Sequence, residues 1–282
     1  MTLGVRGFDL AVTLECGQVF GWTRCEDTYF GMIGGGAVSL RQTGGRLEIA
    51  AEGRASRSRR AAITRYLGLD EDLGAIRRSI AVDPFMRRVL AGVDGLRLLK
   101  QERWPCLCSY LLSSSNRVER IDKSVKEIAR RWGRRHSVGG RDVYELPPPE
   151  EFARCGDAGM RSCGAGFRAP YLVRAAERVA SGDVDLGRVR RLPYEEAKQE
   201  LIRLDGVGEK IADCVLLFAF QKYEAFPVDV WIKKAMEKIY FNSRKVNVRE
   251  IRRFAAEHFG PYAGYAQEYI YYHARTHGLD LE

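Results

Sequence analysis

The sequence lacks a long apolar run and any Cys-x-x-Cys pair. Its longest purely apolar run, residues 215–220, is far shorter than the roughly 20 residues of a membrane-spanning helix. Residues 1–11 contain no basic segment followed by an apolar one, so we expect no secretory signal and no membrane contact. The seven cysteines are scattered and odd in number, which predicts reduced thiols in an intracellular protein.

The composition is that of a globular protein with an excess of positive charge. The chain has 282 residues, 45% of them hydrophobic, which is enough for one large domain or two ordinary ones. Lysine and arginine number 46 against 37 aspartate and glutamate, giving a net charge of +9. This excess favours an anionic partner such as nucleic acid, although a solvated basic surface would give the same balance.

The first third of the chain has the pattern of an antiparallel sheet. Within residues 19–53, four segments rich in aromatic and β-branched residues are separated by turn residues: VFGWTRC, TYFGMIG, AVSLRQT and RLEIAAE. Residues 57–69 and 73–81 are typical of basic amphipathic helices, and we expect the first to cover the sheet.

Beyond residue 83 the apolar spacing is helical almost to the end of the chain. The predicted helices are 85–90, 104–112, 118–132, 149–153, 172–181, 193–204, 209–220, 230–239, 248–259 and 262–277. The sequence therefore predicts an α+β fold, with an N-terminal antiparallel sheet, flanking helices and a larger helical part.

A glycine turn at residues 205–208 lies between two of these helices. Gly206 and Gly208 would let the backbone approach a surface closely, and the free N–H groups that open the second helix form an anion site. A DNA phosphate suits such a site. An ordinary corner between two helices would show the same pattern.

Lys210 follows this turn at a helix start, where the helix dipole disfavours a cation. A desolvated lysine can lose its proton and attack an electrophilic carbon, and a carboxylate such as Asp229 can stabilise a developing cation. Two plainer interpretations remain open. Lys210 would then only contact phosphate, and Asp229 would cap the helix that follows Pro227.

Together, LDGVGEKIADC and FPVDV resemble the helix-hairpin-helix (HhH-GPD) DNA glycosylases. The resemblance is closest to their 8-oxoguanine DNA glycosylase/AP lyase members of the eukaryotic type, and we expect a prokaryotic or archaeal member. It implies an N-terminal β domain at 1–82 and a helical glycosylase domain at 83–282, folded as two lobes with a DNA cleft between them. The helix-hairpin-helix would lie at about 193–220.

The resemblance also assigns the base pocket. CGQVFGW, near the start, is similar to the family segment in which a backbone carbonyl, here that of Gly17, reads N7–H of 8-oxoguanine. GPYAGYAQ places Gln267 where the family binds the Watson–Crick edge of the flipped base, with Tyr271 stacking on that base. Cys214 matches a cysteine on the opposite face. The alternative is that the tyrosines of this helix form core, which we expect of Tyr265 and Tyr269.

Two further segments resemble the family's contacts with the unpaired base left in the duplex. SSSNRVERI aligns Ser115 and Asn116 with an asparagine wedge and Arg120 with an arginine that binds the estranged cytosine. CGAGFRAPY aligns Phe167 with a wedging tyrosine and Arg168 with a second such arginine. Without the resemblance, the first segment is a serine-rich helix cap and the second a glycine loop. Trp231 stands where the family has a phosphate-binding histidine.

The resemblance implies a bifunctional base-excision enzyme that acts on double-stranded DNA containing 8-oxoguanine opposite cytosine. Lys210 and Asp229 would be its catalytic residues, and Gly206, Val207 and Gly208 would hold the DNA phosphate. We expect a monomer, in the cytoplasm and nucleoid or in a nucleus. No cysteine follows Cys214, so we expect no iron–sulfur cluster, no required cofactor and no metal bound by side chains, with a monovalent cation on the hairpin carbonyls as in relatives. The alternatives are a glycosylase for another damaged base and a non-catalytic DNA-binding protein.

Overall fold

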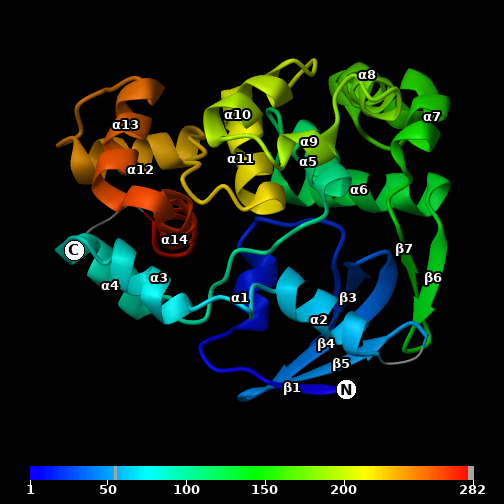
Figure 1. The fold of residues 1–282 in the computed structure, drawn as a ribbon, viewed down its shortest axis with the longest axis horizontal. Helices are drawn as coiled ribbons and strands as arrows, with labels where there is room; N and C mark the ends of the chain where they lie inside the picture. The colour runs from blue at the N-terminus through cyan, green and yellow to red at the C-terminus, as the bar shows by residue number, and fades with distance from the viewer. Residues whose placement is uncertain (54–55, 279–282) are drawn as a thin grey trace.

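A computed structural model describes residues 1–53 and 56–278. A sheet of five antiparallel strands, in the order β1-β5-β4-β3-β2, lies below a larger helical region (Figure 1). The α+β fold class predicted from the sequence is confirmed. The strands are β1 Thr2–Gly4, β2 Thr23–Cys25, β3 Thr28–Ile33, β4 Gly36–Thr43 and β5 Arg46–Ala51.

Alternating apolar residues and glycine turns build this sheet. Leu47 and Ile49 of β5 are buried while their neighbours are exposed, and Leu40 of β4 pairs with Ile49. Gly34 and Gly35 both have positive φ in the turn between β3 and β4, as the tightest hairpin turns require. The four predicted strands are therefore present. The edge strand β1 and helix α1 (Leu10–Glu15) were not predicted, because three and six residues give too short a pattern.

Most helices have the predicted ranges to within a few residues, although the helix predicted at 149–153 continues through a kink at Gly156 to Ser162, and the short helix at 186–189 was not predicted. Their bounds are α2 Arg57–Tyr66, α3 Leu73–Ile80, α4 Pro84–Gly92, α5 Arg103–Leu112, α6 Val118–Trp132, α7 Pro149–Ser162, α8 Ala169–Ala180, α9 Leu186–Val189, α10 Tyr194–Ile202, α11 Glu209–Phe220, α12 Val230–Tyr240, α13 Val248–Phe259 and α14 Ala263–His277, with single 3-10 turns η1 Gly166–Arg168 and η2 Gly260–Tyr262. Aspartate and asparagine N-caps begin several of them, among them Asp83 and Asn247.

A second, two-stranded sheet interrupts the helical region, where the sequence predicted only helices. Strands β6 (Arg135–Val138) and β7 (Arg141–Tyr144) form a hairpin that runs down beside the larger sheet (Figure 1). Val138 and Val143 are buried there against Phe30. The sequence-based expectation was wrong at this point, because four-residue strands show too few alternations to stand out.

Most buried apolar side chains belong to one core that runs through the helical region. Leu73, Ile76 and Ile80 of α3 are part of it, although α3 lies in the segment predicted as the N-terminal domain. The predicted division at 82/83 stays a prediction, and residues 279–282 of the second predicted domain lie outside the described part. Tyr265 and Tyr269 are fully buried, as expected of core residues.

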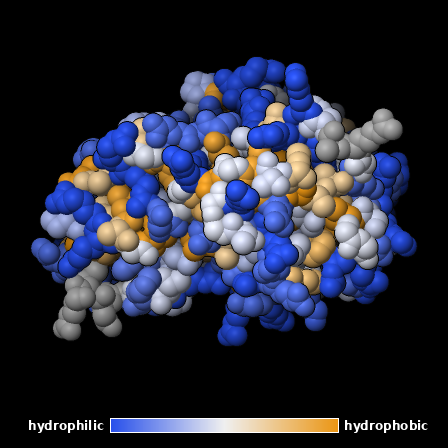
Figure 2. Space-filling model, turned by 90° about the horizontal axis from the view of Figure 1, so that it is seen from below, coloured by the Kyte–Doolittle hydropathy of each residue, from blue (hydrophilic) through white to orange (hydrophobic). Residues whose placement is uncertain are grey.

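Hydrophilic side chains cover most of the face that Figure 2 shows, and apolar residues are exposed between them, as is usual for a protein surface. Within the described part of the chain, every helix is too short or too polar to cross a lipid bilayer.

Candidate active site

The glycine turn joins α10 to α11 as the sequence predicts, and it opens directly onto a cavity of about 670 Å³. Gly206 has a φ of +80°, and a Cβ there would lie 2.7 Å from the ring of Tyr171. Gly208 has extended backbone and caps α11, and a Cβ at this position would meet no other atom within 4 Å. The first glycine is therefore required by the fold, whereas the second leaves open space at a helix N-terminus.

Val207, between them, has a different environment. Its side chain is buried and its N–H donates to the carbonyl of Leu204 at 3.0 Å. In this structure it supports the turn from inside and does not line the cavity.

A buried ionic network fixes α11 against its neighbours. The Asp213 carboxylate lies 3.0 Å from the Lys198 ammonium of α10 and 2.8 Å from the Arg252 guanidinium of α13. Tyr194 also donates to Asp213, at 2.6 Å. Burial raises the pKa of Asp213, while the two cations oppose this effect. Helices α10 and α13 thus hold α11, whose first turn contains Lys210.

Lys210 points its ammonium into the cavity. Nζ donates to Oγ of Ser113 at 3.2 Å and lies 5.5 Å from the centre of the Tyr110 ring. Cys214 lies one helical turn further on and lines the same cavity. Burial raises the pKa of the Cys214 thiol to about 12, although the nearby Lys210 charge lowers it. The thiol therefore stays neutral beside the amine.

Asp229 lines the cavity from the start of α12. Its Oδ1 accepts from the Ile232 N–H at 2.7 Å, so it is also the N-cap of that helix. Asp229 and Lys210 both line the cavity, and the hydrogen bonds of their side chains go to other groups, Lys210 to Ser113 and Asp229 to the Ile232 N–H. The helix-cap interpretation is confirmed, and it leaves the carboxylate facing the same space as the amine.

The four predicted base-pocket residues, Gly17, Cys214, Gln267 and Tyr271, line this cavity together. Gly17 has a φ of +107°, and within the described residues no hydrogen bond uses its carbonyl. Gln267 is buried, and its Oε1 has no hydrogen-bond partner there. The Gly17 carbonyl oxygen and the Gln267 Oε1, from opposite ends of the chain, are thus both available to bind a ligand in this pocket.

The predicted wedge residues are divided between the cavity lining and its surroundings. Ser115 and Asn116 line the cavity, and Ser115 has a φ of +48°, which is uncommon for a residue other than glycine. Phe167 is 52% exposed and Arg120 is exposed, both outside the lining. Arg168 is buried and donates to the carbonyls of Ser114 and Ser115, at 2.6 and 2.9 Å, so it holds the loop that carries the wedge.

Sequence reasoning missed Glu268, which is buried and lines the cavity. Its Oε1 has no hydrogen-bond partner among the described residues. Burial raises the pKa of Glu268 to about 7, and the charge of Asp229 raises it further, while Cys16 and Arg275 lower it. The sequence contained one signal for it, because Glu268 lies between Gln267, expected in the base pocket, and Tyr269, expected in the core.

Two segments of the chain match known protein families. Residues 2–107 match the N-terminal domain of 8-oxoguanine DNA glycosylase, and residues 108–261 match the HhH-GPD superfamily base excision DNA repair proteins. The chain belongs to the HhH-GPD superfamily. The resemblance inferred from the sequence is confirmed.

Individual proteins also match the chain. The "Probable N-glycosylase/DNA lyase" of Methanothermobacter thermautotrophicus is 37% identical over 205 residues, which are 66% of this chain and 65% of that relative. The 8-oxoguanine glycosylase/lyase of Clostridium acetobutylicum, solved with double-stranded DNA containing cytosine opposite 8-oxoguanine, has a TM-score of 0.91 and 32% identity, covering 96% of this chain and 93% of that one. The structure of MBOgg1 with a low-affinity DNA ligand has a TM-score of 0.92 and 33% identity, covering 98% and 94%.

Proposed function

We propose that this protein removes 8-oxoguanine from double-stranded DNA and then cuts the strand at the resulting abasic site. The observation that supports this most is the meeting of Lys210 and Asp229 with Gly17 and Gln267 in one cavity. The Clostridium relative, with 8-oxoguanine opposite cytosine, supports the same lesion and the same opposite base.

In the proposed reaction the base is flipped out of the duplex into this cavity. The Lys210 amine attacks C1′ of the sugar, the N-glycosidic bond breaks, and the base leaves with the bonding electrons and takes up a proton. Asp229 stabilises the positive charge that develops on the sugar. The lysine and the opened sugar then form a Schiff base. Loss of a C2′ proton breaks the C3′–O bond and releases the 3′ phosphate.

The remaining surface is proposed to hold the distorted duplex. Ser115, Asn116 and Phe167 would fill the gap left by the base, and Arg120 and Arg168 would contact the orphaned cytosine. Because Arg168 is occupied by the 114–115 loop, its contact with DNA requires that it exchange or share these hydrogen bonds. The N-terminus of α11, with Gly206, Val207 and Gly208, would bind a phosphate.

We propose that no cofactor is required, and that a monovalent cation binds at the hairpin. In the described residues the carbonyls of Asp205, Gly206 and Val207 accept no hydrogen bond, so three oxygen ligands of the right kind are free there. The protein would act as a monomer where chromosomal DNA lies, in the cytoplasm and nucleoid or in a nucleus.

Borohydride trapping tests this proposal. A duplex with 8-oxoguanine should give a covalent protein–DNA adduct, because borohydride reduces the Schiff base to a stable amine. The adduct should be absent in Lys210→Gln and remain in Lys233→Gln, which removes another lysine of the same cavity lining. An adduct that persists in Lys210→Gln would show that another amine is the nucleophile. A strong preference for a different damaged base in a panel of duplexes would contradict the assigned lesion.

A further inference from the structure

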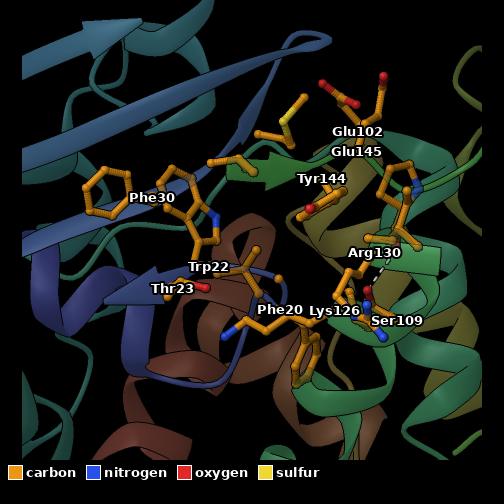
Figure 3. A pocket seen from close by; sticks show the side chains of 18 of the residues that line it. Phe20, Trp22, Thr23, Phe30, Glu102, Ser109, Lys126, Arg130, Tyr144 and Glu145 are labelled. Carbon is orange, nitrogen blue, oxygen red and sulfur yellow. Dashed lines mark hydrogen bonds between the residues drawn. The ribbon is translucent and has the colours of Figure 1, made fainter. Parts of the chain in front are cut away.

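A second cavity, of about 500 Å³, lies between the five-stranded sheet and helices α5 and α6 (Figure 3). We call it the sheet-side cavity. Its lining includes neither Lys210 nor Asp229, and it shares only Phe20 with the cavity that holds them. Its size lies within the range of about 300–1,000 Å³ that is typical of small-molecule sites.

Aromatic side chains form much of its wall, namely Phe20, Trp22, Phe30, Tyr66 and Tyr144. The Trp22 ring is held firmly in place. Its Nε1 donates to the Tyr66 hydroxyl at 3.2 Å, and it lies so close to β3 that a Cβ on Gly31 would be 2.4 Å from the ring. Fixed flat surfaces of this kind suit a planar ligand.

Two carboxylates, Glu102 and Glu145, belong to the cavity lining, and Figure 3 draws both toward the same end of it. Within the described residues neither forms an ion pair with lysine or arginine. Glu145 has only Nε2 of His136 at 3.4 Å, and Glu102 accepts from the Gly35 N–H at 3.3 Å. Carboxylates of a cavity lining that have no lysine or arginine partner attract a cationic group of a ligand.

The lysine and arginine side chains of the lining have other partners and do not neutralise Glu102 or Glu145. Lys126 is paired with Asp122 at 2.7 Å, and Arg130 is paired with Glu127 at 3.0 Å. Arg141 lies over the ring of Phe30, 5.4 Å from its centre. This last contact shows that the aromatic wall accepts a planar cation.

We propose that the sheet-side cavity binds a flat aromatic cation, a ring system that carries an amidine, a guanidine or a protonated amine. The ring lies among the aromatic side chains, and the charged group lies between Glu102 and Glu145. This inference uses no residue of the proposed reaction, so it stands or falls independently of Lys210.

The test uses three probes with the same ring and different charge: 2-naphthamidine, the neutral 2-naphthamide and the anionic 2-naphthoate. Each is titrated by calorimetry into the whole protein without DNA. We expect the amidine to bind about tenfold or more tightly than the amide, because it gains charge-assisted hydrogen bonds, and the naphthoate to bind most weakly. In the wild type the amidine should also quench tryptophan fluorescence, and this quenching should be lost in Trp22→Phe.

Substitutions locate the charge. The variant Glu102→Gln/Glu145→Gln should bind the amidine no better than the amide. The single variant Glu102→Gln, at an exposed position, should lose only part of the preference for the amidine over the amide. The control Glu48→Gln/Glu177→Gln has the same change in net charge at exposed positions outside the lining, and it should bind the amidine like the wild type. Absence of binding, equal affinity for the three probes, or an unchanged affinity in Glu102→Gln/Glu145→Gln would each overturn the proposal.

Discussion

At the scale of single residues, Asp229 combines a structural contact with the proposed chemical one. One carboxylate oxygen caps α12, and the residue also lines the cavity with Lys210. Asparagine caps helices as well as aspartate does, because its side-chain oxygen accepts the same hydrogen bond. The two contributions can therefore be separated by substitution.

We predict that Asp229→Asn folds normally and is nearly inactive. Its free energy of unfolding should change by less than about 1 kcal/mol, because the cap is kept. The single-turnover rate of base removal should fall by about 100-fold or more, because the negative charge beside the sugar is lost. Urea denaturation and a quenched cleavage assay measure the two effects. A wild-type cleavage rate would leave Asp229 with the capping function alone.

Glu268 gives a prediction about pH. Its folded-state pKa is about 7, above the ordinary glutamate value of 4.5, so the folded protein binds the proton more tightly than the unfolded chain. This contribution to stability is fully present below pH about 4.5 and is lost as the pH rises through 7. At one pKa unit per 1.4 kcal/mol, the loss is about 3 kcal/mol.

The variant Glu268→Gln, which cannot ionise, should avoid that loss. Relative to the wild type, its free energy of unfolding should be higher at pH 8 than at pH 5 by up to about 3 kcal/mol. Urea denaturation at the two pH values measures the difference, and the exposed Glu257→Gln serves as control. A difference between wild type and Glu268→Gln that does not change with pH would show that Glu268 ionises normally.

At this scale the sequence predicted well the residues that belong to contiguous motifs. Gly17, Gln267 and Cys214 line one cavity, and each could be identified beforehand because it lies in a recognisable contiguous segment. Glu268 was not predicted, since its buried environment includes the Cys16 side chain, which is far away in the chain. The buried position of Arg168 likewise depends on a loop more than 50 residues earlier.

At the scale of secondary-structure elements, the turn between α10 and α11 places the nucleophile. Its two glycines serve different purposes. Gly206 has positive φ and lies against Tyr171, whereas Gly208 has an ordinary conformation and open space beside it.

We predict opposite defects for alanine at these two positions. Gly206→Ala should destabilise the fold by about 1–3 kcal/mol, through backbone strain and the clash with Tyr171. Gly208→Ala should cost about 1 kcal/mol or less, yet weaken DNA binding because a methyl group then stands between the helix N-terminus and a phosphate. Thermal unfolding and fluorescence anisotropy with a labelled duplex distinguish them. Unchanged DNA affinity in Gly208→Ala would contradict the phosphate site.

The helices were predictable because their apolar spacing persists over several turns, and α6 and α11 have the predicted bounds. The hairpin of β6 and β7 was not. Its strands are four residues long, and their stability comes from contact with Phe30 of the larger sheet, which no local pattern reveals. The sheet-side cavity could not be predicted for the same reason, since it lies where this hairpin meets the sheet.

At the scale of the whole molecule, the proposed site is assembled from segments that are far apart in the sequence. Gly17 lies between α1 and β2, Lys210 follows the glycine turn, and Gln267 lies in the last helix. The large core shared by these helices holds them in position, and the net charge of +9 favours approach to DNA. Recognition of the base and attack on its sugar therefore depend on the complete fold.

The central claim is that Lys210 forms the covalent link to the DNA in this assembled cavity. Its most direct test is peptide mapping by mass spectrometry of the wild-type protein after borohydride trapping on an 8-oxoguanine duplex. We predict that the reduced sugar adduct lies on Lys210 and on no other residue. An adduct on another lysine or on the N-terminal amine would contradict the account.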